Sequence, residues 1–448
     1  MLTKENPDFQ KQGTGGTDTD PPLDELFKTS LKVGIFSFGG PAAQISMMHQ
    51  EFVERRKWLS EDRFLHALNY CMLLPGPEAQ QLATYCGWIA GRSWGGLISG
   101  LLFILPGAVA MAFVSWIYAR FGSVGVIDAL FYGIKAGVLA VVLQALFKVA
   151  QKALKNALAW GISLASFVAL FLFSIPFPIV IVLAAFAGMV FGKTGPPNPE
   201  GQNITPSPSV YRTLRALAIG LILWAAPAVF AAWALTPDHI LIDIASFFAT
   251  LAAVSFGGAY ALLSYMAQVA VETKNWLTAG EMLDGLGLAE TTPGPLILVT
   301  QFVGFLAGWR QPEPFSPLTG GLLAAFMTTW VTFVPSFMLV LAGAPWMEKL
   351  RGNQHLTAAL TGITAAVTGT ILNLAVWFAL NVLFKDIREF SAGPATIVYP
   401  RIESADPGLV AIACVATALV FWARRGVATV VILTALLGLA LRAVTTGL

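Results

Sequence analysis

Long apolar stretches separated by short polar segments run along almost the whole chain. A helix that crosses a bilayer needs roughly 20 mostly apolar residues, and thirteen stretches approach or exceed that length. They lie at 24–50, 64–90, 95–119, 124–150, 157–174, 176–192, 214–235, 239–270, 281–309, 316–345, 355–384, 405–422 and 427–446. The pattern predicts an all-α polytopic membrane protein with about 13 transmembrane helices.

Two polar segments divide the chain. Residues 1–22 are polar and glycine-rich, with no apolar run before a small-residue cleavage site, so they are expected to form a disordered tail and not a signal peptide. Residues 193–213 have the proline, glycine and serine content of a hydrophilic linker. The predicted organisation is therefore a first membrane unit at 23–192, an extra connecting span at 214–238 and a second membrane unit at 239–448.

Composition supports a membrane protein and excludes two other classes. Hydrophobic residues make up 56% and charged residues 12%, with a mean hydropathy of +0.70, whereas soluble proteins carry about 25% charged residues. The net charge of +2 lacks the basic excess of a nucleic-acid-binding protein. Neither the three cysteines nor the four histidines have metal-ligand spacing, so no metal or cofactor is expected.

The loop charges give an orientation. With the N-terminus inside, the inner segments hold 16 lysines and arginines, the outer segments hold ten, and Lys135 lies within a span. Because this excess marks the cytoplasmic side, the N-terminus is predicted to be cytoplasmic and the C-terminus periplasmic.

An internal repeat relates the two membrane units. A shift of 218 residues aligns SFGG at 37–40 with SFGG at 255–258, and LPGP at 74–77 with TPGP at 292–295. Of the 41 ungapped positions, 17 are identical, where chance gives about three at ordinary residue frequencies. Corresponding segments are separated by seven predicted membrane crossings. Because this number is odd, the second copy has the opposite orientation in the membrane to the first. Inverted repeats with a substrate site at their interface are typical of secondary transporters.

Each half also has two predicted helix breaks inside apolar surroundings. The start of a broken helix offers backbone N–H groups and a partial positive charge to an anion; the alternative is that the glycines permit close helix packing. Gly188, in an unbroken stretch, is expected to tolerate alanine. The candidate positions at the breaks are Ser37, Gly39, Gly40, Pro41, Pro75, Gly76, Pro77, Ser255, Gly257, Gly258, Pro293, Gly294 and Pro295.

Polar side chains near the breaks complete the candidate substrate site. Glu78 and Glu290 suit proton coupling, gating or helix capping. Lys135, the one basic residue clearly inside a span, is predicted either to attract an anion or to neutralise an acid. The uncharged candidates for orienting an anion are Gln44, Asn69, Gln81, Thr291, Thr292 and Gln301.

At these motifs the sequence resembles the long-chain chromate transporters. FSFGGPAAQISMMHQEFVERRKWL, LLPGPEAQQLATYCGW, VSFGGAYALLSYMAQ and GLAETTPGPLILVTQFVGF carry the resemblance, which extends from about residue 23 onward. It implies a bacterial inner-membrane protein that exports chromate, a sulfate-like oxyanion, and so confers chromate resistance. The positions implied to matter are Gly39, Gly40, Pro41, 75–81, Gly257, Gly258 and 290–295.

Three functional classes are weighed. They are a secondary transporter of chromate, sulfate or another tetrahedral oxyanion, a passive anion channel, and a membrane-embedded enzyme. An enzyme would need a nucleophile with a base, or a metal set, and the sequence shows neither, so a non-enzymatic transporter is favoured. The expected partners are the oxyanion and the lipid bilayer, with a homodimer left open.

Overall fold

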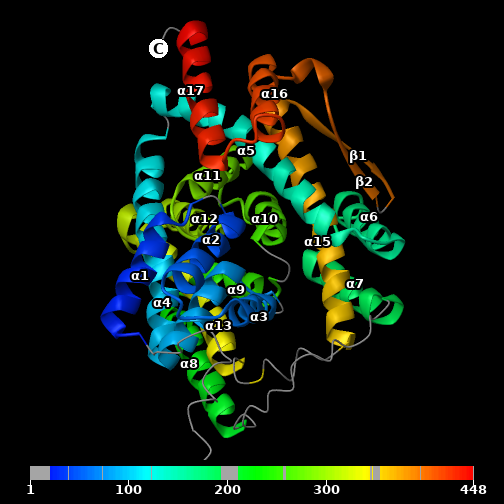
Figure 1. Ribbon diagram of the computed structural model, residues 1–448. Helices are drawn as coiled ribbons and strands as arrows, with labels where there is room; N and C mark the ends of the chain where they lie inside the picture. Colours follow the sequence, from blue (N-terminus) through cyan, green and yellow to red (C-terminus); the bar gives the residue numbers. More distant parts are fainter. Residues whose placement is uncertain are drawn as a thin grey trace, which may run out of the picture.

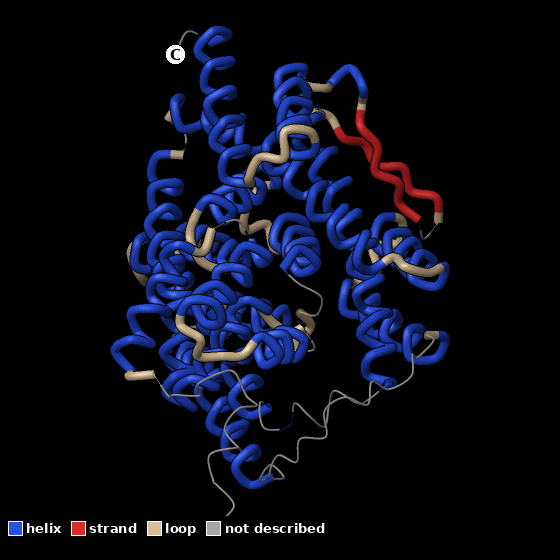
Figure 2. The backbone as a smooth tube through the Cα atoms, viewed as in Figure 1, coloured by secondary structure: helices blue, strands red, loops and turns tan. Residues whose placement is uncertain are grey.

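The computed structural model describes residues 21–38, 40–72, 74–122, 124–192, 210–255, 259–343, 346, 354–393 and 395–446. Nearly all of this part of the chain is helical, with one β-hairpin (Figures 1 and 2). The elements up to the linker are α1 Leu23–Phe36, α2 Gly40–His49, η2 Gln50–Arg55, α3 Glu61–Cys71, α4 Glu78–Phe121, α5 Gly125–Ala153, α6 Ala157–Phe171 and α7 Phe177–Phe191. Those after it are α8 Val210–Ala234, α9 Ile240–Ala253, α10 Ala259–Gln268, η3 Val269–Thr273, α11 Ala279–Thr291, η4 Leu296–Leu298, α12 Val299–Arg310, α13 Pro317–Gly343, α15 Gln354–Leu383, β1 Ile387–Ala392, β2 Ala395–Pro400, η6 Ile402–Ser404, α16 Pro407–Phe421 and α17 Val427–Thr446.

The helices have the length and composition of membrane spans. In the described residues, six are long and apolar enough to cross a membrane, within α4, α5, α8, α13, α15 and α17, and five shorter helices are also apolar. The prediction of an all-helical polytopic membrane protein is thereby confirmed, apart from the hairpin. The count of thirteen complete crossings stays a prediction. The expected tail at 1–22 and linker at 193–213 fall almost wholly outside the described residues.

Four of the apolar stretches are not continuous helices. The stretch at 24–50 divides into α1 and α2, that at 64–90 into α3 and the start of α4, that at 239–270 into α9 and α10, and that at 281–309 into α11 and α12. Apart from α4, these helices have 10 to 14 residues, fewer than the roughly 20 that a full crossing needs. The turns contain Gly40, Gly76 and Gly294 at φ +79°, +124° and +89°, a region that glycine enters without strain.

The two halves break at matching positions. The segments η2 and η3 are π-helical and correspond under the 218-residue shift. After them Lys57 and Asn275, also a matched pair, take left-handed backbone conformations with φ of 53° and 52°. Ser60 and Thr278 then cap α3 and α11 through their side chains. Similar residues at the same spacing thus produce the same local structure in both halves.

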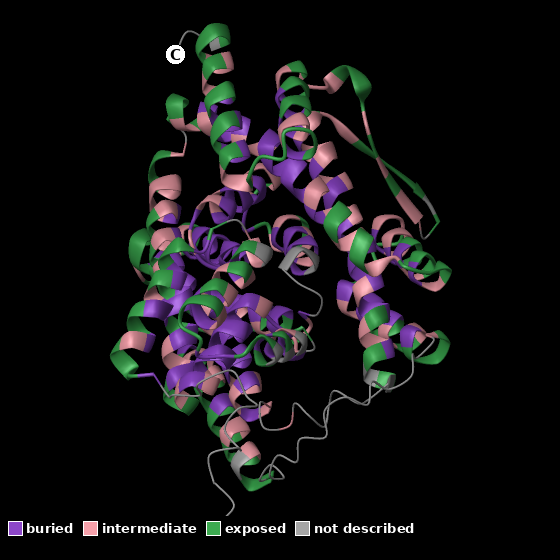
Figure 3. Ribbon diagram, viewed as in Figure 1, coloured by how far each residue is buried: buried purple, intermediate pink, exposed green. Residues whose placement is uncertain are grey.

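The long helices of each half pack against the last helices of the other. Helices α16 and α17 pack against α5, and α6 and α7 pack against α15, with α5 and α15 in contact (Figure 1). Close approaches make this possible: Gly133 lies against the carbonyl of Thr434 and Gly188 against that of Ala358. Buried residues are most frequent in α11 and α12, whereas α6, α7, α16 and α17 are more exposed (Figure 3).

The β-hairpin was not predicted from the sequence. Strands β1 and β2 pair antiparallel from Ile387 opposite Pro400 to Ala392 opposite Ala395. The N–H of Thr396 donates to the carbonyl of Leu172 at 2.8 Å, which ties the hairpin to the end of α6. A search for long apolar stretches passes over such a short segment, although β-branched residues around a Gly-Pro turn are typical of a hairpin.

Candidate functional site

The two Pro-Gly-Pro turns are each held by the opposite half of the chain. The N–H of Gly76 donates to the carbonyl oxygen of Ser255 at 2.8 Å, and the N–H of Gly294 donates to that of Ser37 at 3.1 Å. These pairs correspond under the shift of 218 residues. Each turn from one half therefore meets the helix break of the other half, and the structure brings together the motifs that the sequence analysis singled out.

A residue in a long helix of the opposite half closes each turn from behind. A Cβ added to Gly76 would collide with Ser336 Oγ in α13, and one added to Gly107 in α4 would collide with the carbonyl oxygen of Pro293. Gly107 and Ser336 correspond under a shift of 229 residues, which also aligns Pro106 with Pro335, so each follows a proline inside its helix. The turns consequently sit in narrow slots formed by the other half.

Both turns lead directly into a helix start that has no side-chain cap. Pro77 precedes α4 and Pro295 precedes η4, and neither position provides a side-chain hydrogen bond to the first turn. The N–H groups of a first turn have no partner within their own helix. Two such starts inside an apolar protein form a favourable environment for an anion.

Four buried glutamines lie around these turns. Nε2 of Gln44 donates to the carbonyl of Gly294 at 2.6 Å, Nε2 of Gln81 to that of Pro75 at 2.7 Å, and Nε2 of Gln301 to that of Ala108 at 2.8 Å. The fourth is Gln80, which donates to Thr84 Oγ1 at 3.0 Å. In the described residues, none of the four Oε1 atoms has a hydrogen-bond partner. Because an amide has two donors and an acceptor, these side chains retain capacity to bind a polar ligand.

Position 40 favours glycine because of its backbone conformation, and the space around it is open and not filled by a packed helix. It has φ +79°, and an added Cβ would meet no atom within 4 Å among those described. The close-packing alternative raised from the sequence therefore does not apply at this position. Gly39, Gly257 and Gly258 lie outside the described residues, as does the side chain of Asn69.

Three candidate hydroxyl groups are engaged with their own helices. Ser37 donates to the carbonyl of Val33, Thr291 to those of Gly287 and Leu288 at 3.0 Å, and Thr292 to that of Ala289 at 3.4 Å. A hydroxyl has a single proton, so in this conformation these groups offer no donor to an oxyanion. Their observed role is to finish α1 and α11.

The two predicted acids occupy different places, as their unequal positions in the repeat suggested. Glu290 is 4% exposed near the end of α11, and Glu78 is the first residue of α4, partly buried. A carboxylate in a first turn interacts favourably with the helix dipole. An anion that reached the start of α4 would therefore compete with Glu78. Pro41, in the first turn of α2, is also partly buried.

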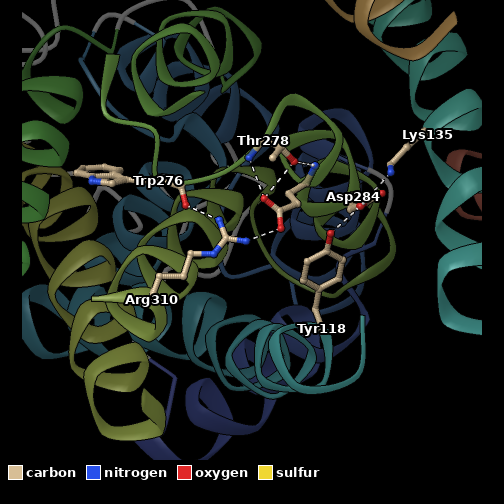
Figure 4. Close-up of polar contacts among 7 residues, drawn as sticks. Tyr118, Lys135, Trp276, Thr278, Asp284 and Arg310 are labelled. Carbon is tan, nitrogen blue, oxygen red and sulfur yellow. Dashed lines mark hydrogen bonds and ion pairs between the residues drawn. The ribbon is translucent and has the colours of Figure 1, made fainter. Parts of the chain in front are cut away.

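Lys135 does not point to the turns; it is paired with an acid that sequence reasoning missed. Its Nζ lies 3.5 Å from Oδ2 of Asp284 in α11, and Tyr118 Oη donates to the same oxygen at 2.7 Å (Figure 4). Asp284 is 2% exposed. With a rise of 1.5 Å per residue, Asp284 lies about 12 Å along α11 from Thr292. The alternative that Lys135 neutralises an acid is thus the one observed.

A second ion pair lies one turn before Asp284. Arg310 of α12 pairs with Glu281 and donates to the carbonyl of Trp276 at 2.6 Å, while Glu281 forms a capping box with Thr278 (Figure 4). Hydrogen bonds from Thr278 and Arg310 thus hold the Glu281 carboxylate on both sides. The start of α11 is therefore fixed by charge and hydrogen bonding before Asp284 is reached.

Fold and site together define a polytopic helical membrane protein with paired discontinuous helices. The family model described as chromate transporter matches two segments of the chain, residues 25–189 and 242–439. The chain belongs to the chromate transporter family.

Curated relatives agree with this assignment. The chain is 32% identical over 363 residues to the chromate transport protein of Pseudomonas aeruginosa, covering 78% of this chain and 80% of that one. It is 28% identical over 406 residues to the probable chromate transport protein of Synechococcus elongatus, covering 90% and 96%. It is also 28% identical to the chromate transport protein of Cupriavidus metallidurans over 380 residues, or 85% and 88%. No solved structure matches the chain.

Proposed function

We propose that the protein is a secondary transporter that exports chromate from the cytoplasm across a bacterial inner membrane and so confers chromate resistance. The observation that carries the proposal is the pair of reciprocal hydrogen bonds, Gly76 to Ser255 and Gly294 to Ser37. They attach an uncapped helix start of each half to the other half. Family membership and the chromate transport proteins among the relatives support the substrate class.

The oxyanion binds at the starts of α4 and η4 in this proposal. The backbone N–H groups of the first turns contact its oxygens. Gly40 lies in the chain between Ser37 and Gln44, the two residues bonded to Gly294, and leaves open space among the described residues. Gln44 and Gln301 orient the ligand through their second Nε2 protons. Each charge-assisted hydrogen bond contributes about 1.5–3 kcal/mol, so two or three of them suffice for a selective site.

The two Pro-Gly-Pro turns, each hydrogen-bonded to the opposite half and called the crossed turns below, also link binding to movement. Each helix start is hydrogen-bonded to the opposite half, so a rotation of one half relative to the other displaces both starts together. We propose two inverted repeats, about 13 crossings, a cytoplasmic N-terminus and a periplasmic C-terminus. In this arrangement the halves rock around a ligand near the midplane, as in other inverted-repeat transporters. Sulfate, which has the same tetrahedral shape, is the second candidate substrate.

Transport by the purified full chain in proteoliposomes tests the proposal. Chromate and sulfate uptake should be saturable and should respond to imposed pH and potential gradients, and everted membrane vesicles should accumulate chromate. Current that depends only on the anion gradient, without saturation, would identify a passive channel. If neither chromate nor sulfate enters the proteoliposomes under any gradient, the transport proposal is refuted.

A further inference from the structure

The carboxylate of Asp284 is only half satisfied. Oδ2 accepts a hydrogen bond from Tyr118 and lies near Lys135, whereas Oδ1 is buried and has no hydrogen-bond partner among the described residues (Figure 4). A carboxylate that is removed from water needs donors on both oxygens to remain ionised without a large cost. The ionised form of Asp284 therefore depends on Lys135.

Lys135 is well placed to leave this partner. Its Nζ is 3.5 Å from Oδ2, longer than a short charge-assisted hydrogen bond, and its side chain is 25% exposed while that of Asp284 is 3% exposed. The ammonium group ends a flexible four-carbon chain. It can turn away from Asp284 toward an anion, whereas Asp284 stays buried in α11.

The next charged group along α11 is already neutralised by a partner of its own. Glu281 lies on the same helix and is paired with Arg310 of α12. Helix α17 brings only Arg442, which lies over the ring of Tyr132. Between them α15 and η4 carry one titratable residue, His355 near the far end of α15. Asp284 with Lys135 and Glu281 with Arg310 form two neutral pairs. An anion that engages Lys135 therefore leaves the Asp284 carboxylate without its cation.

We propose that Asp284 takes up a proton when an oxyanion takes Lys135 away from it. The proton comes from water and converts the carboxylate to the neutral acid, while Lys135 remains an ammonium ion and becomes the partner of the anion. Oxyanion and proton thus bind together. Because Asp284 and the end of α11 lie about 12 Å apart along the helix, Lys135 acts as a second position on the transport route. This inference rests on the proposed oxyanion transport.

Proton uptake on binding tests the coupling. In weakly buffered detergent solution, the wild-type full chain should take up close to one more proton per bound chromate than the Asp284→Asn variant does. Protons exchanged by chromate itself cancel in this difference. The matched control is Asp243→Asn, which removes a carboxylate paired with Lys274 at 2.5 Å but 38% exposed; it should behave as wild type.

A second measurement keeps the test decisive if Asp284→Asn does not fold. The wild-type affinity for sulfate, which stays fully ionised over the working range, should fall by up to tenfold for each unit of pH increase, since linkage is reciprocal. Equal proton uptake by wild type and Asp284→Asn, or a sulfate affinity that does not change with pH, would overturn the coupling while leaving oxyanion transport intact. If the protein binds neither chromate nor sulfate at any pH, the proposed function is refuted, and the coupling with it.

Discussion

Gly76 donates its backbone N–H to the carbonyl oxygen of Ser255, and the equivalent bond from Gly294 to Ser37 mirrors it in the other half. Each glycine thus carries out two tasks at once: it adopts a positive φ that a side chain disfavours, and it places its N–H in the opposite half. The site is consequently built from segments that are far apart in the sequence, and both halves must fold to complete it.

Gly76→Ala should impair the protein more than Gly294→Ala. Both lose about 1–2 kcal/mol from the left-handed conformation. At Gly76 the new Cβ also collides with Ser336 Oγ, whereas at Gly294 it would lie 3.2 Å from Leu298 and 3.3 Å from Gly107. Thermal unfolding in detergent should show the difference. Adding Ser336→Gly, which copies the glycine of the other half, should recover part of the loss in Gly76→Ala; no recovery would mean that the collision is not the cause.

Gly40→Asn should separate conformation from ligand space. Asparagine tolerates a left-handed backbone better than alanine does, so stability should stay within about 1 kcal/mol of wild type, while the side chain fills the open space beside Gly40. We expect the chromate dissociation constant to rise roughly ten- to hundredfold, equivalent to about 1.4–2.8 kcal/mol.

The control for this substitution is Gly161→Ala in α6, where a Cβ meets nothing within 4 Å and φ is ordinary. It should leave binding unchanged and should not lower stability, since alanine favours a helix more than glycine does. Gly188, expected from the sequence to be tolerant, is unsuitable because a Cβ there would strike the carbonyl of Ala358. Unchanged chromate binding by a folded Gly40→Asn protein would place the ligand elsewhere.

Lys135→Gln should lower both transport and stability, because it leaves Asp284 buried without its cation. Breaking a buried pair on one side costs about 3–5 kcal/mol. Asp284 can escape this cost by binding a proton, so the deficit in melting temperature should be smaller at pH 6 than at pH 8. Lys135→Gln combined with Asp284→Asn should restore stability but not transport. A single mutant as stable as wild type at both pH values would show that the pair contributes nothing to folding.

Asp406 provides a pH test that is independent of transport. Burial raises its pKa, but hydrogen bonds from Tyr132, Leu409 and Gly408 outweigh this and lower the pKa below its usual value. A lowered pKa means that the ionised side chain stabilises the fold at neutral pH and that this contribution is lost as the pH falls through the folded-state pKa.

Loss of this helix cap in Asp406→Ala should cost about 0.5–2 kcal/mol at pH 7, measured as a lower unfolding temperature. The difference from wild type should narrow below about pH 4. Asp406→Asn, which can still accept from Gly408 and Leu409, should lose less than Asp406→Ala. A difference that is constant from pH 7 to pH 3 would contradict the assignment.

The sequence predicts the helical class, the helix breaks and the repeat, because hydropathy and the Pro-Gly motifs are local signals. It does not predict that Gly76 reaches Ser255, because that contact depends on how the halves interleave. Asp284 was missed for a related reason: it lies three residues into the stretch at 281–309, where an acid reads as a helix-end residue. Only tertiary structure brings Lys135 to it. The repeat offered no help, since the counterpart of Asp284 is His66.

The most direct test of the central claim is to locate the bound anion. Anomalous scattering from chromium in crystals of the full chain grown with chromate identifies the ligand without reference to the protein contacts. We expect a chromium peak beside the crossed turns at Gly76 and Gly294. The oxygens of that chromate should lie within hydrogen-bonding distance of the first-turn N–H groups of α4 or η4. An ordered chromate at full occupancy that touches neither helix start would contradict the account.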